Sequence, residues 1–380
     1  MIVDADSHLY ETRDLWLDRT PAAGRDKALR IVDDEHGYAW LTLGDRRIEV
    51  LGVHQPGTVD QSGDFRLRLD QGLPPRVPYD DMPASFWDPG ARIRALDGFG
   101  IDEAVLLPNC GIMWERALED DLEATKLNME AWNRRAVEVV SEGGGRLHPV
   151  GHLSLRDPEW FEQQVRALGQ GGVRLCMVAP SLADGRRLSH PRHERAWSAM
   201  EEAGVALVFH IAQYHMPFDD AWNEGDPDWS NPVMSSVFMW TAPAMALADL
   251  AVRGVLHRHP DLRVGVVELM SAWLPQFLLM LDGGFGFHAA FNGRPLTEMP
   301  LKPSEYITRQ VRVAAFPFER PDRLRQAAGD MFMFGSDFPH PEGLADPVPD
   351  FLARMDTGVD DSGFFGANAS WLLGRALARG

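Results

Sequence analysis

The sequence predicts an α/β fold in which one (β/α)8 barrel spans all 380 residues. Two observations lead to this prediction. Short apolar runs alternate with helix-like stretches along the whole chain, and no internal repeat of roughly 20–50 residues is present. A doubly wound sheet is the alternative, but the first strand-like run is followed by no glycine-rich turn, and no Gly-x-Gly-x-x-Gly motif occurs. The barrel is therefore preferred.

Eight strands are expected where aliphatic and β-branched residues run together between turn residues. They are Ile2–His8, Glu103–Pro108, Leu147–Leu153, Val173–Val178, Val205–Ile211, Arg263–Leu269, Gln310–Ala314 and Met331–Ser336. The helices expected between them are Pro89–Phe99, Leu118–Ser141, Pro158–Gly169, Pro191–Ala203, Ala242–His259, Ala272–Asp282, Arg320–Gln326 and Pro347–Arg354.

Three segments are longer than ordinary connections. Glu11–Asp88 follows the first strand and is interpreted as an insertion with a β-hairpin, because Tyr38–Leu43 and Arg47–Val50 alternate in polarity. Ala212–Met239 follows the fifth strand, and Gly283–Tyr306 is expected to be a loop after the sixth helix. Long loops at the carboxyl ends of barrel strands commonly form lids or substrate walls.

Composition excludes several classes of partner. The chain has 37 basic and 56 acidic side chains, a net charge of -19, and no basic run, which argues against binding nucleic acid or an anionic membrane. Only Lys27, Lys126 and Lys302 are lysines. The two cysteines, Cys110 and Cys176, form no disulfide framework, and no signal peptide or 18–20-residue apolar span is recognised, so a cytoplasmic protein is expected.

The first expected strand carries acidic residues where a barrel is normally apolar. Because side chains alternate along a strand, Asp4, Asp6 and His8 are expected on one face, and Val3, Ala5 and Ser7 on the other. Two carboxylates and an imidazole inside a barrel need a compensating charge, which a divalent metal ion supplies. A turn capped by the acids after Ile2-Val3 is the alternative.

Two other strands end in residues that bind metals. His210 closes the apolar run of the fifth strand, and Asp337 follows the eighth. Each alone is compatible with a structural role: a hydrogen-bonded core histidine, or a turn aspartate before Phe338-Pro339. Strands one and eight are neighbours in a closed barrel, however, so Asp6, His8 and Asp337 are expected to converge with His210 at the rim where barrel enzymes work.

These residues resemble a known family. The matching segments are Asp4-Ala5-Asp6-Ser7-His8, Asp14-Leu15-Trp16, His210, Phe334-Gly335-Ser336-Asp337-Phe338-Pro339-His340 and Gly366-Ala367-Asn368-Ala369-Ser370. They resemble the amidohydrolase superfamily, and within it the amidohydrolase-related branch that includes aminocarboxymuconate-semialdehyde decarboxylase and γ-resorcylate decarboxylase. The resemblance covers residues 2 to about 374, apart from the two long segments after strands one and five.

The resemblance implies a metal site and its ligands. Carried over by position, the ligands are Asp6, His8, His210 and Asp337, and Asp337 is also an acid/base group. Superfamily members with two metals bridge them by a carbamylated lysine on the fourth strand, which here reads Gly172-Val173-Arg174-Leu175-Cys176-Met177. One divalent ion is therefore expected. Zinc is the first candidate, and manganese and iron are also compatible with carboxylate and histidine ligands.

The chain departs from the family on the sixth strand. Many members have a catalytic histidine where this chain has Glu268, so Glu268 either takes over the proton transfer or indicates different chemistry. His152 is a further catalytic candidate, with a core histidine as the alternative. Substrate contacts are expected from Arg174, His215, His340 and Trp273.

The resemblance implies a metal-dependent decarboxylase of a small aromatic or unsaturated carboxylic acid. Hydrolysis of a C–N, ester or activated C–C bond is the alternative, since the same ligands can activate water. A barrel that only binds its ligand is a third hypothesis, supported by the missing histidine alone. The family also suggests a homodimer acting on a small molecule.

Overall fold

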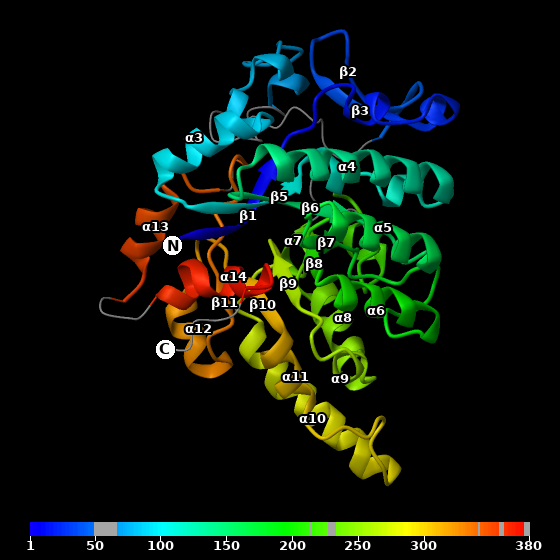
Figure 1. The fold of residues 1–380 in the computed structure, drawn as a ribbon, viewed down its shortest axis with the longest axis vertical. Coiled ribbons are helices and arrows are strands. Elements are labelled where there is room, and N and C mark those ends of the chain that lie inside the picture. The colour runs from blue at the N-terminus through cyan, green and yellow to red at the C-terminus, as the bar shows by residue number, and fades with distance from the viewer. Residues whose placement is uncertain (49–66, 213, 227–232, 341–342, 357–360, 376–380) are drawn as a thin grey trace.

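A computed structural model describes residues 1–48, 67–212, 214–226, 233–340, 343–356 and 361–375 (Figure 1). Its centre is a sheet of eight parallel strands that follow one another in chain order. The strands are β1 (Val3–Leu9), β5 (Glu103–Pro108), β6 (Leu147–His152), β7 (Leu175–Met177), β8 (Ala206–His210), β9 (Val264–Val267), β10 (Val311–Ala314) and β11 (Phe332–Met333).

The first and last strands bring the sheet nearly to closure. Ala5 N donates to Phe334 O at 2.9 Å, and Ser7 forms a parallel bridge with Phe338 just beyond β11. The predicted (β/α)8 barrel is confirmed. The interior is filled by small and branched side chains such as Val105, Val150 and Val208, as expected for a packed barrel.

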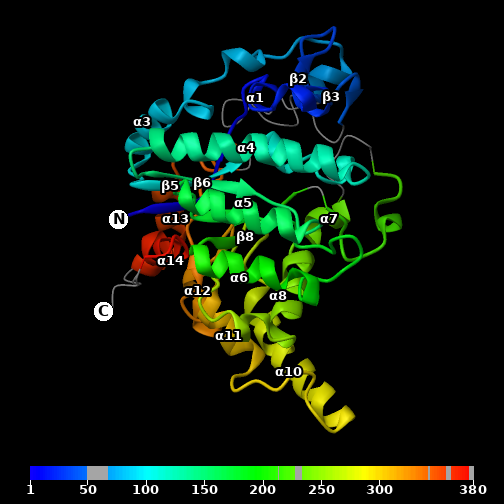
Figure 2. The same cartoon turned by 45° about the vertical axis from the view of Figure 1, so that its right-hand side comes forward.

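Helices surround the barrel, and α4, α5 and α6 lie side by side in Figure 2. The helices of the barrel layer are α3 (Pro89–Phe99), α4 (Leu122–Glu142), α5 (Pro158–Gln170), α6 (Glu194–Ala203), α8 (Thr241–Val252), α9 (Val255–Arg258), α10 (Leu274–Asn292), α11 (Pro303–Gln310), α12 (Pro321–Ala328), α13 (Pro347–Arg354) and α14 (Asn368–Leu372). Aspartates cap several of them: Asp88, Asp121 and Asp157 accept hydrogen bonds from backbone N–H groups in the first turn. None of the described helices is long and apolar enough to cross a membrane.

A second, small sheet lies between β1 and α3. Strand β2 (Leu29–Asp33) pairs antiparallel with β3 (Ala39–Leu43), which pairs in turn with β4 (Arg46–Arg47). The expected run at Tyr38–Leu43 therefore contains β3, which pairs mainly with the preceding strand, β2. Of the expected run at Arg47–Val50, residues 49 and 50 lie outside the described part of the chain. Short helices occur in both long segments: α1 (Leu15–Asp18) follows β1, and α7 (Val233–Val237) lies in the segment after β8.

The expectation of a loop at Gly283–Tyr306 is wrong. Helix α10 continues to Asn292, and α11 begins at Pro303. The expected helix ended at Asp282, but Gly283, Gly284 and Gly286 all lie within α10, which ends at Gly293 with a φ of 73°. The second half of α10 projects from the body of the molecule (Figure 1).

The expected alternation on β1 is also wrong for Val3, Asp4 and Ala5. The register of β1 against β5 shifts between Asp4 and Ser7, so a β-bulge interrupts the strict two-residue period. Val3 and Ala5 therefore face the barrel interior, whereas the Asp4 carboxylate accepts hydrogen bonds from Ser336 N at 2.9 Å and Ser336 Oγ at 2.5 Å. Asp4 helps to join β1 to β11, and the bulge leaves Asp6 and His8 pointing to the site.

Candidate metal centre

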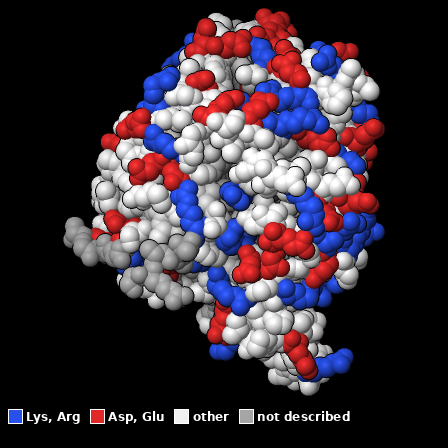
Figure 3. All heavy atoms as spheres, in the orientation of Figure 1, with Lys and Arg blue, Asp and Glu red and all other residues white. Residues whose placement is uncertain are grey.

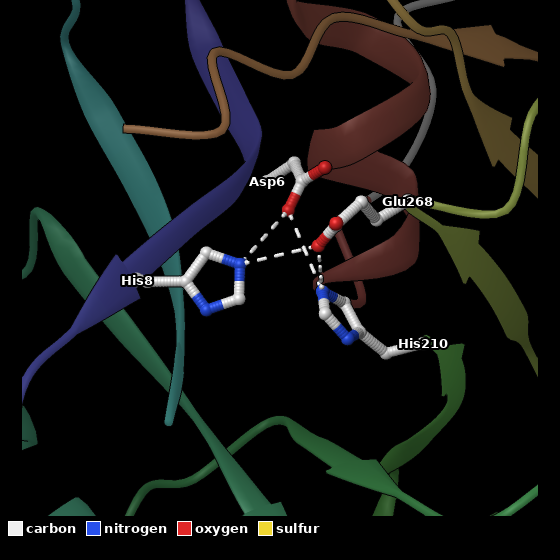
Figure 4. Close-up of side chains that lie close together, drawn as sticks. All are labelled: Asp6, His8, His210 and Glu268. Atoms are coloured by element: carbon white, nitrogen blue, oxygen red, sulfur yellow. Dashed lines mark ion pairs between the residues drawn. The ribbon is translucent and has the colours of Figure 1, made fainter. Parts of the chain in front are cut away.

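Four buried side chains converge at the carboxyl ends of three barrel strands (Figure 4). Asp6 and His8 come from β1, His210 is the last residue of β8, and Glu268 directly follows β9. Each is at most 7% exposed. The strands are short and rigid, so the barrel fixes the positions of all four groups.

The distances show how closely the four groups face one another. His210 Nε2 lies 3.0 Å from Glu268 Oε2 and 3.8 Å from Asp6 Oδ1. His8 Nε2 lies 3.5 Å from Glu268 Oε2 and 3.7 Å from Asp6 Oδ1. Ligands of one metal ion at about 2.0–2.2 Å lie roughly 3–4 Å from each other. The spacing therefore suits a single cation.

Backbone carbonyls orient both imidazoles toward the cluster. Pro108 O lies 3.0 Å from His8 Nδ1, and Ile211 O lies 2.6 Å from His210 Nδ1. Because a carbonyl oxygen only accepts, each Nδ1 carries the proton and donates it. In the neutral tautomer each Nε2 then presents a lone pair to the centre, as a metal-ligating histidine does.

The residues fit a divalent metal ion. Asp6 Oδ1, His8 Nε2, His210 Nε2 and Glu268 Oε2 are all buried without a hydrogen-bond partner. Leaving a buried polar atom unsatisfied costs about 1–3 kcal/mol, and more when it is charged. A cation at the centre would satisfy all four atoms at once, and their types suit zinc, manganese or iron.

Asp337 and His340 form the adjoining edge of the cluster. Asp337 Oδ1 lies 3.4 Å from His8 Nε2 and 2.9 Å from His340 Nδ1. The His340 ring stacks on His8 with centroids 3.9 Å apart, and His340 Nε2 is 2.7 Å from Asn109 Oδ1. His8, Glu268, Asp337 and His340 thus form a second set of converging ligand atoms that overlaps the first.

The two central histidines have opposite pKa shifts in the metal-free protein. Burial lowers the pKa of His8 to about 4. Burial also opposes the charged form of His210, but the facing carboxylates of Asp6 and Glu268 outweigh it and raise its pKa to about 10. The same contacts lower the pKa of Glu268 despite its burial. A cation that binds here must therefore displace a proton from His210.

The backbone at two site residues is strained. Glu268 has a φ of 52° and Asp337 a φ of 55°, in the left-handed region that non-glycine residues rarely occupy. Such conformations cost on the order of 1–3 kcal/mol each and persist where the surroundings enforce them. Backbone strain of this kind is commonly found at functional sites.

Glu319 anchors the strained segment after β9 and was missed by sequence reasoning. Its buried carboxylate accepts hydrogen bonds from Ser271 N at 2.8 Å, Ala272 N at 2.6 Å and Phe316 N at 2.7 Å. No local pattern marks this role, because two of its three backbone partners, Ser271 and Ala272, lie 48 and 47 residues away in the sequence.

Glu11 anchors the loop after β5 in the same way. Its carboxylate accepts from Cys110 N at 2.9 Å and Gly111 N at 2.8 Å, and burial raises its pKa to about 7. This loop begins with Asn109, the partner of His340. From the sequence, Glu11 was expected only as the first residue of the long segment after the first strand.

Two other expected site residues, His152 and His215, contact residues outside the cluster. His152 ends β6 and is buried, with its Nε2 3.4 Å from Glu115 Oε2. His215 is 60% exposed and pairs with Glu119 at 2.7 Å. Glu115, Glu119 and His215 line a cavity of about 830 Å³, which none of the cluster's side chains lines.

Trp273 has a structural contact, and Arg174 differs from the expectation. The indole N–H of Trp273 donates to Met270 O at 2.8 Å, so this group holds the loop after β9. Arg174 is exposed and precedes β7, which begins only at Leu175, and it interacts electrostatically with His148 and Arg263. It lies at the opposite end of the barrel from the cluster, so the expected substrate clamp is corrected.

Comparisons with known proteins agree with this geometry. The family model described as Amidohydrolase matches residues 3–375. A search of curated proteins gave no significant match.

Solved structures share the fold over nearly the whole chain. An amidohydrolase from Mycobacterium avium subsp. paratuberculosis K-10 is 25% identical, with a TM-score of 0.76 and 98% of each chain covered. 5-Carboxyvanillate decarboxylase from Novosphingobium aromaticivorans, solved with manganese and 4-hydroxy-3-methoxy-5-nitrobenzoic acid, is 19% identical, with a TM-score of 0.66 and coverage of 99% and 96%. 2,6-Dihydroxybenzoate decarboxylase from Rhizobium is 17% identical, with a TM-score of 0.62 and 98% of each chain covered.

Proposed function

The chain belongs to the amidohydrolase family, and on that premise we propose that this metal-dependent enzyme decarboxylates a small aromatic or unsaturated carboxylic acid. The observation that carries the proposal is the buried cluster of Asp6, His8, His210 and Glu268, in which two imidazole Nε2 atoms face two carboxylates. Structural neighbours that decarboxylate hydroxylated aromatic acids support the choice of reaction.

We assign the binding of one divalent ion to Asp6, His8, His210 and Glu268. When bound, the ion supplies a Lewis acid that holds substrate oxygens and stabilises negative charge. Zinc stays a candidate, and the manganese in a neighbouring structure adds weight to manganese. Glu268 thereby becomes a ligand in this proposal, where the sequence had suggested a proton-transfer group.

Asp337 is the proposed proton carrier. Its carboxyl group lies beside the cluster, 2.9 Å from His340 Nδ1, and His340 is itself held by Asn109. As the C–C bond to the carboxylate breaks, its electron pair stays on the substrate carbon and CO2 leaves. The proton on Asp337 then passes to that carbon, and His340 orients the carboxyl group for the transfer.

Hydrolysis of a neutral substrate is the second candidate, and one observation favours it. Asp6, Glu268 and Asp337 place three carboxylates within one buried cluster, whereas a divalent ion contributes two positive charges. With neutral histidines, the site would keep a net negative charge unless one carboxyl is protonated. Such a site accepts a neutral ester, amide or lactone more readily than an anionic acid. Here Asp337 would accept a proton from the attacking water.

Metal analysis and a substrate screen test the proposal. Purified protein should contain about one equivalent of a transition metal, and release of CO2 from hydroxylated benzoates should exceed turnover of ester and amide panels. Asp337→Asn should lower turnover by at least about 100-fold with the metal retained, as expected for a group that transfers the proton. Asp102→Asn, a change at an exposed carboxylate at the far end of the barrel, is the matched control.

Three results would contradict the proposal: wild-type protein without stoichiometric metal, full turnover by Asp337→Asn, or hydrolysis without CO2 release. The last of these would favour the second candidate.

A further inference from the structure

Two adjoining cavities lie at the end of the barrel that carries the metal centre. The larger one, of about 830 Å³, is lined mainly by the segments that follow β5, β6, β7 and β8. The smaller one, of about 560 Å³, is lined by the segment after β8 and by helices α8 and α10. Pro217 and Met245 line both cavities. We call them the polar chamber and the apolar chamber, and their volumes are typical of small-molecule sites.

The two chambers depend on a segment that belongs to this chain rather than to its family. The family resemblance does not extend to Ala212–Met239, and this segment supplies walls of both chambers. The apolar chamber also borders the metal centre. Trp240, in its wall, stacks on Trp273 with ring centroids 6.3 Å apart. The Trp273 N–H donates to Met270 O at 2.8 Å, two residues after Glu268.

The walls of the apolar chamber suit an uncharged group. Among the described residues, none that lines this chamber is charged, and five of the ten are aromatic: Phe218, Trp222, Phe238, Trp240 and Phe277. Its hydroxyl group, on Thr241, donates to Phe238 O at 2.7 Å and is therefore already used. A ring or an aliphatic chain gains from burial against such walls, whereas a charged group would lose its hydration without compensation.

The polar chamber offers no unpaired cation to an anionic group. Each of its three arginines pairs with a carboxylate: Arg116 with Asp220 at 2.6 Å, Arg156 with Asp184 at 2.8 Å, and Arg187 with Asp249 at 3.8 Å. Two more carboxylates line the chamber. Glu115 faces His152 at 3.4 Å, and Asp120 has no partner in the described part of the chain. Acidic and basic side chains are likewise interspersed on the face seen in Figure 3. A carboxylate of a ligand would therefore be repelled from the polar chamber.

One polar group of the polar chamber is available to a ligand. Tyr214 is only 7% exposed, and its hydroxyl has no hydrogen-bond partner among the described residues. Burial raises the pKa of this phenol above its usual value, so the hydroxyl keeps its proton and can donate it. Arg156 Nη1 also lacks a partner, but this atom is closed off from solvent. A buried donor without an acceptor is costly, and an uncharged oxygen of a ligand would satisfy Tyr214.

From these observations we propose that the two chambers bind the far end of the substrate, and that this end is an uncharged apolar group with an oxygen that accepts from Tyr214. The proposal rests on the proposed function, because it assigns the reacting carboxylate to the metal centre. The substrate class is then a monocarboxylic acid with an apolar ether or carbonyl substituent. A dicarboxylic acid is disfavoured, because its second carboxylate would enter the polar chamber.

Isothermal titration calorimetry on the metal-loaded enzyme tests the proposal with three acids. They are salicylate, salicylate with a benzyloxy group para to its carboxylate, and the same ether with a second carboxylate on its outer ring. The ether should bind at least about 10-fold more tightly than salicylate, because burial of a phenyl ring is favourable by about that factor or more. The second carboxylate should remove this gain.

A charge on the shared wall tests the site directly. Met245 is 59% exposed, so the fold should tolerate Met245→Glu. The ratio of the dissociation constants of salicylate and the ether should fall from about 10 to about 1, because the added carboxylate opposes burial of the ring. Leu352→Glu is the matched control. It makes the same change at an exposed apolar position on α13 that lines neither chamber, and it should keep the wild-type ratio.

Two other variants test the hydrogen bond and the charge argument. Tyr214→Phe removes the donor and should lower the same ratio by roughly 3-fold or more. Asp120→Lys replaces an unpaired carboxylate by a cation and should strengthen binding of the diacid, relative to the ether, by about 5-fold or more. Circular dichroism and metal content verify that each variant is folded.

Several results would overturn the proposal. They are an ether that binds no more tightly than salicylate, a diacid that binds more tightly than the ether, wild-type ratios in Met245→Glu or Tyr214→Phe, and no gain for the diacid in Asp120→Lys. Release of CO2 from salicylate without tighter binding of the ether would contradict this site alone. Tight binding of the ether without release of CO2 would contradict the proposed reaction alone.

Discussion

Replacing Glu268 by glutamine tests the assignment of this residue as a metal ligand. The substitution keeps the shape of the side chain and removes one negative charge from a site where Glu268 Oε2 lies 3.0 Å from His210 Nε2. Changes to groups that only support metal ligands already weaken metal binding by about 10–100-fold. Loss of a charged ligand should therefore cost at least about 100-fold, or roughly 3 kcal/mol, where proton competition is weak.

Proton competition gives this prediction a pH dependence. The pKa of His210 is raised to about 10 in the metal-free protein, so below that pH the metal must displace one proton. Wild-type affinity should therefore rise about 10-fold per pH unit between pH 6.5 and 8.5. In Glu268→Gln one of the two carboxylates that raise this pKa is gone, so the slope should be smaller. The difference in affinity between the two proteins should thus grow with pH.

Isothermal titration calorimetry in competition with a chelator of known affinity tests this prediction. It gives the Mn²⁺ or Zn²⁺ affinity of each protein and the change of that affinity with pH. Glu115→Gln is the matched control, because Glu115 contacts His152 at 3.4 Å and belongs to neither ligand set. Its metal affinity should stay within about 3-fold of wild type, a typical effect away from the ligands. If Glu268→Gln binds metal as tightly as Glu115→Gln across this pH range, Glu268 is not a ligand.

Three further predictions concern the residues that support the site. The folded-state pKa of Glu11 is about 7, above its usual 4.5, so wild-type stability should fall by up to about 3 kcal/mol as pH rises between these values. In Glu11→Gln, the free energy of unfolding measured with urea should fall less with rising pH than in wild type. Equal pH slopes for the two proteins would contradict the argument from burial. Glu319→Gln leaves a backbone N–H without an acceptor and should lower stability by about 1–3 kcal/mol; an unchanged Tm and metal content would refute its anchoring role. Asn109→Ala should reduce kcat by about 10-fold with the metal and KM retained, because only the orientation of Asp337 through His340 is lost; a loss of metal instead would show a structural role.

The strands were predictable because a parallel sheet is covered on both faces. Such strands have continuous apolar sequences, and Glu103–Pro108 was predicted to the residue. The ends of strands are harder to predict from sequence than their central residues. β7 has three residues where six were expected, and this shortening places Arg174 before the strand and at the wrong end of the barrel.

Features that depend on distant residues could not be predicted from a local pattern. The bulge in β1 depends on its pairing with both β5 and β11, so the expectation for Asp4 failed even though Asp6 and His8 were placed together. Glu319 and Glu11 are ordinary acidic residues in sequence, and only the fold brings them to unpaired N–H groups. Helix α10 continues through three glycines in spite of their low helix propensity, and no helix-ending pattern stands before Gly293.

The number of metal ions connects the sequence argument to the geometry. The absence of a lysine on the fourth strand predicted one ion, and the two overlapping ligand sets of the structure would at first suggest two. Both sets, however, use His8 Nε2, and one imidazole nitrogen has one lone pair and binds one cation. We therefore expect one ion, bound by Asp6, His8, His210 and Glu268. Because His8 is already used by that ion, Asp337 and His340 cannot share it with a second one. That division agrees with the proposed roles, in which four residues hold the cation and the Asp337–His340 pair carries the proton.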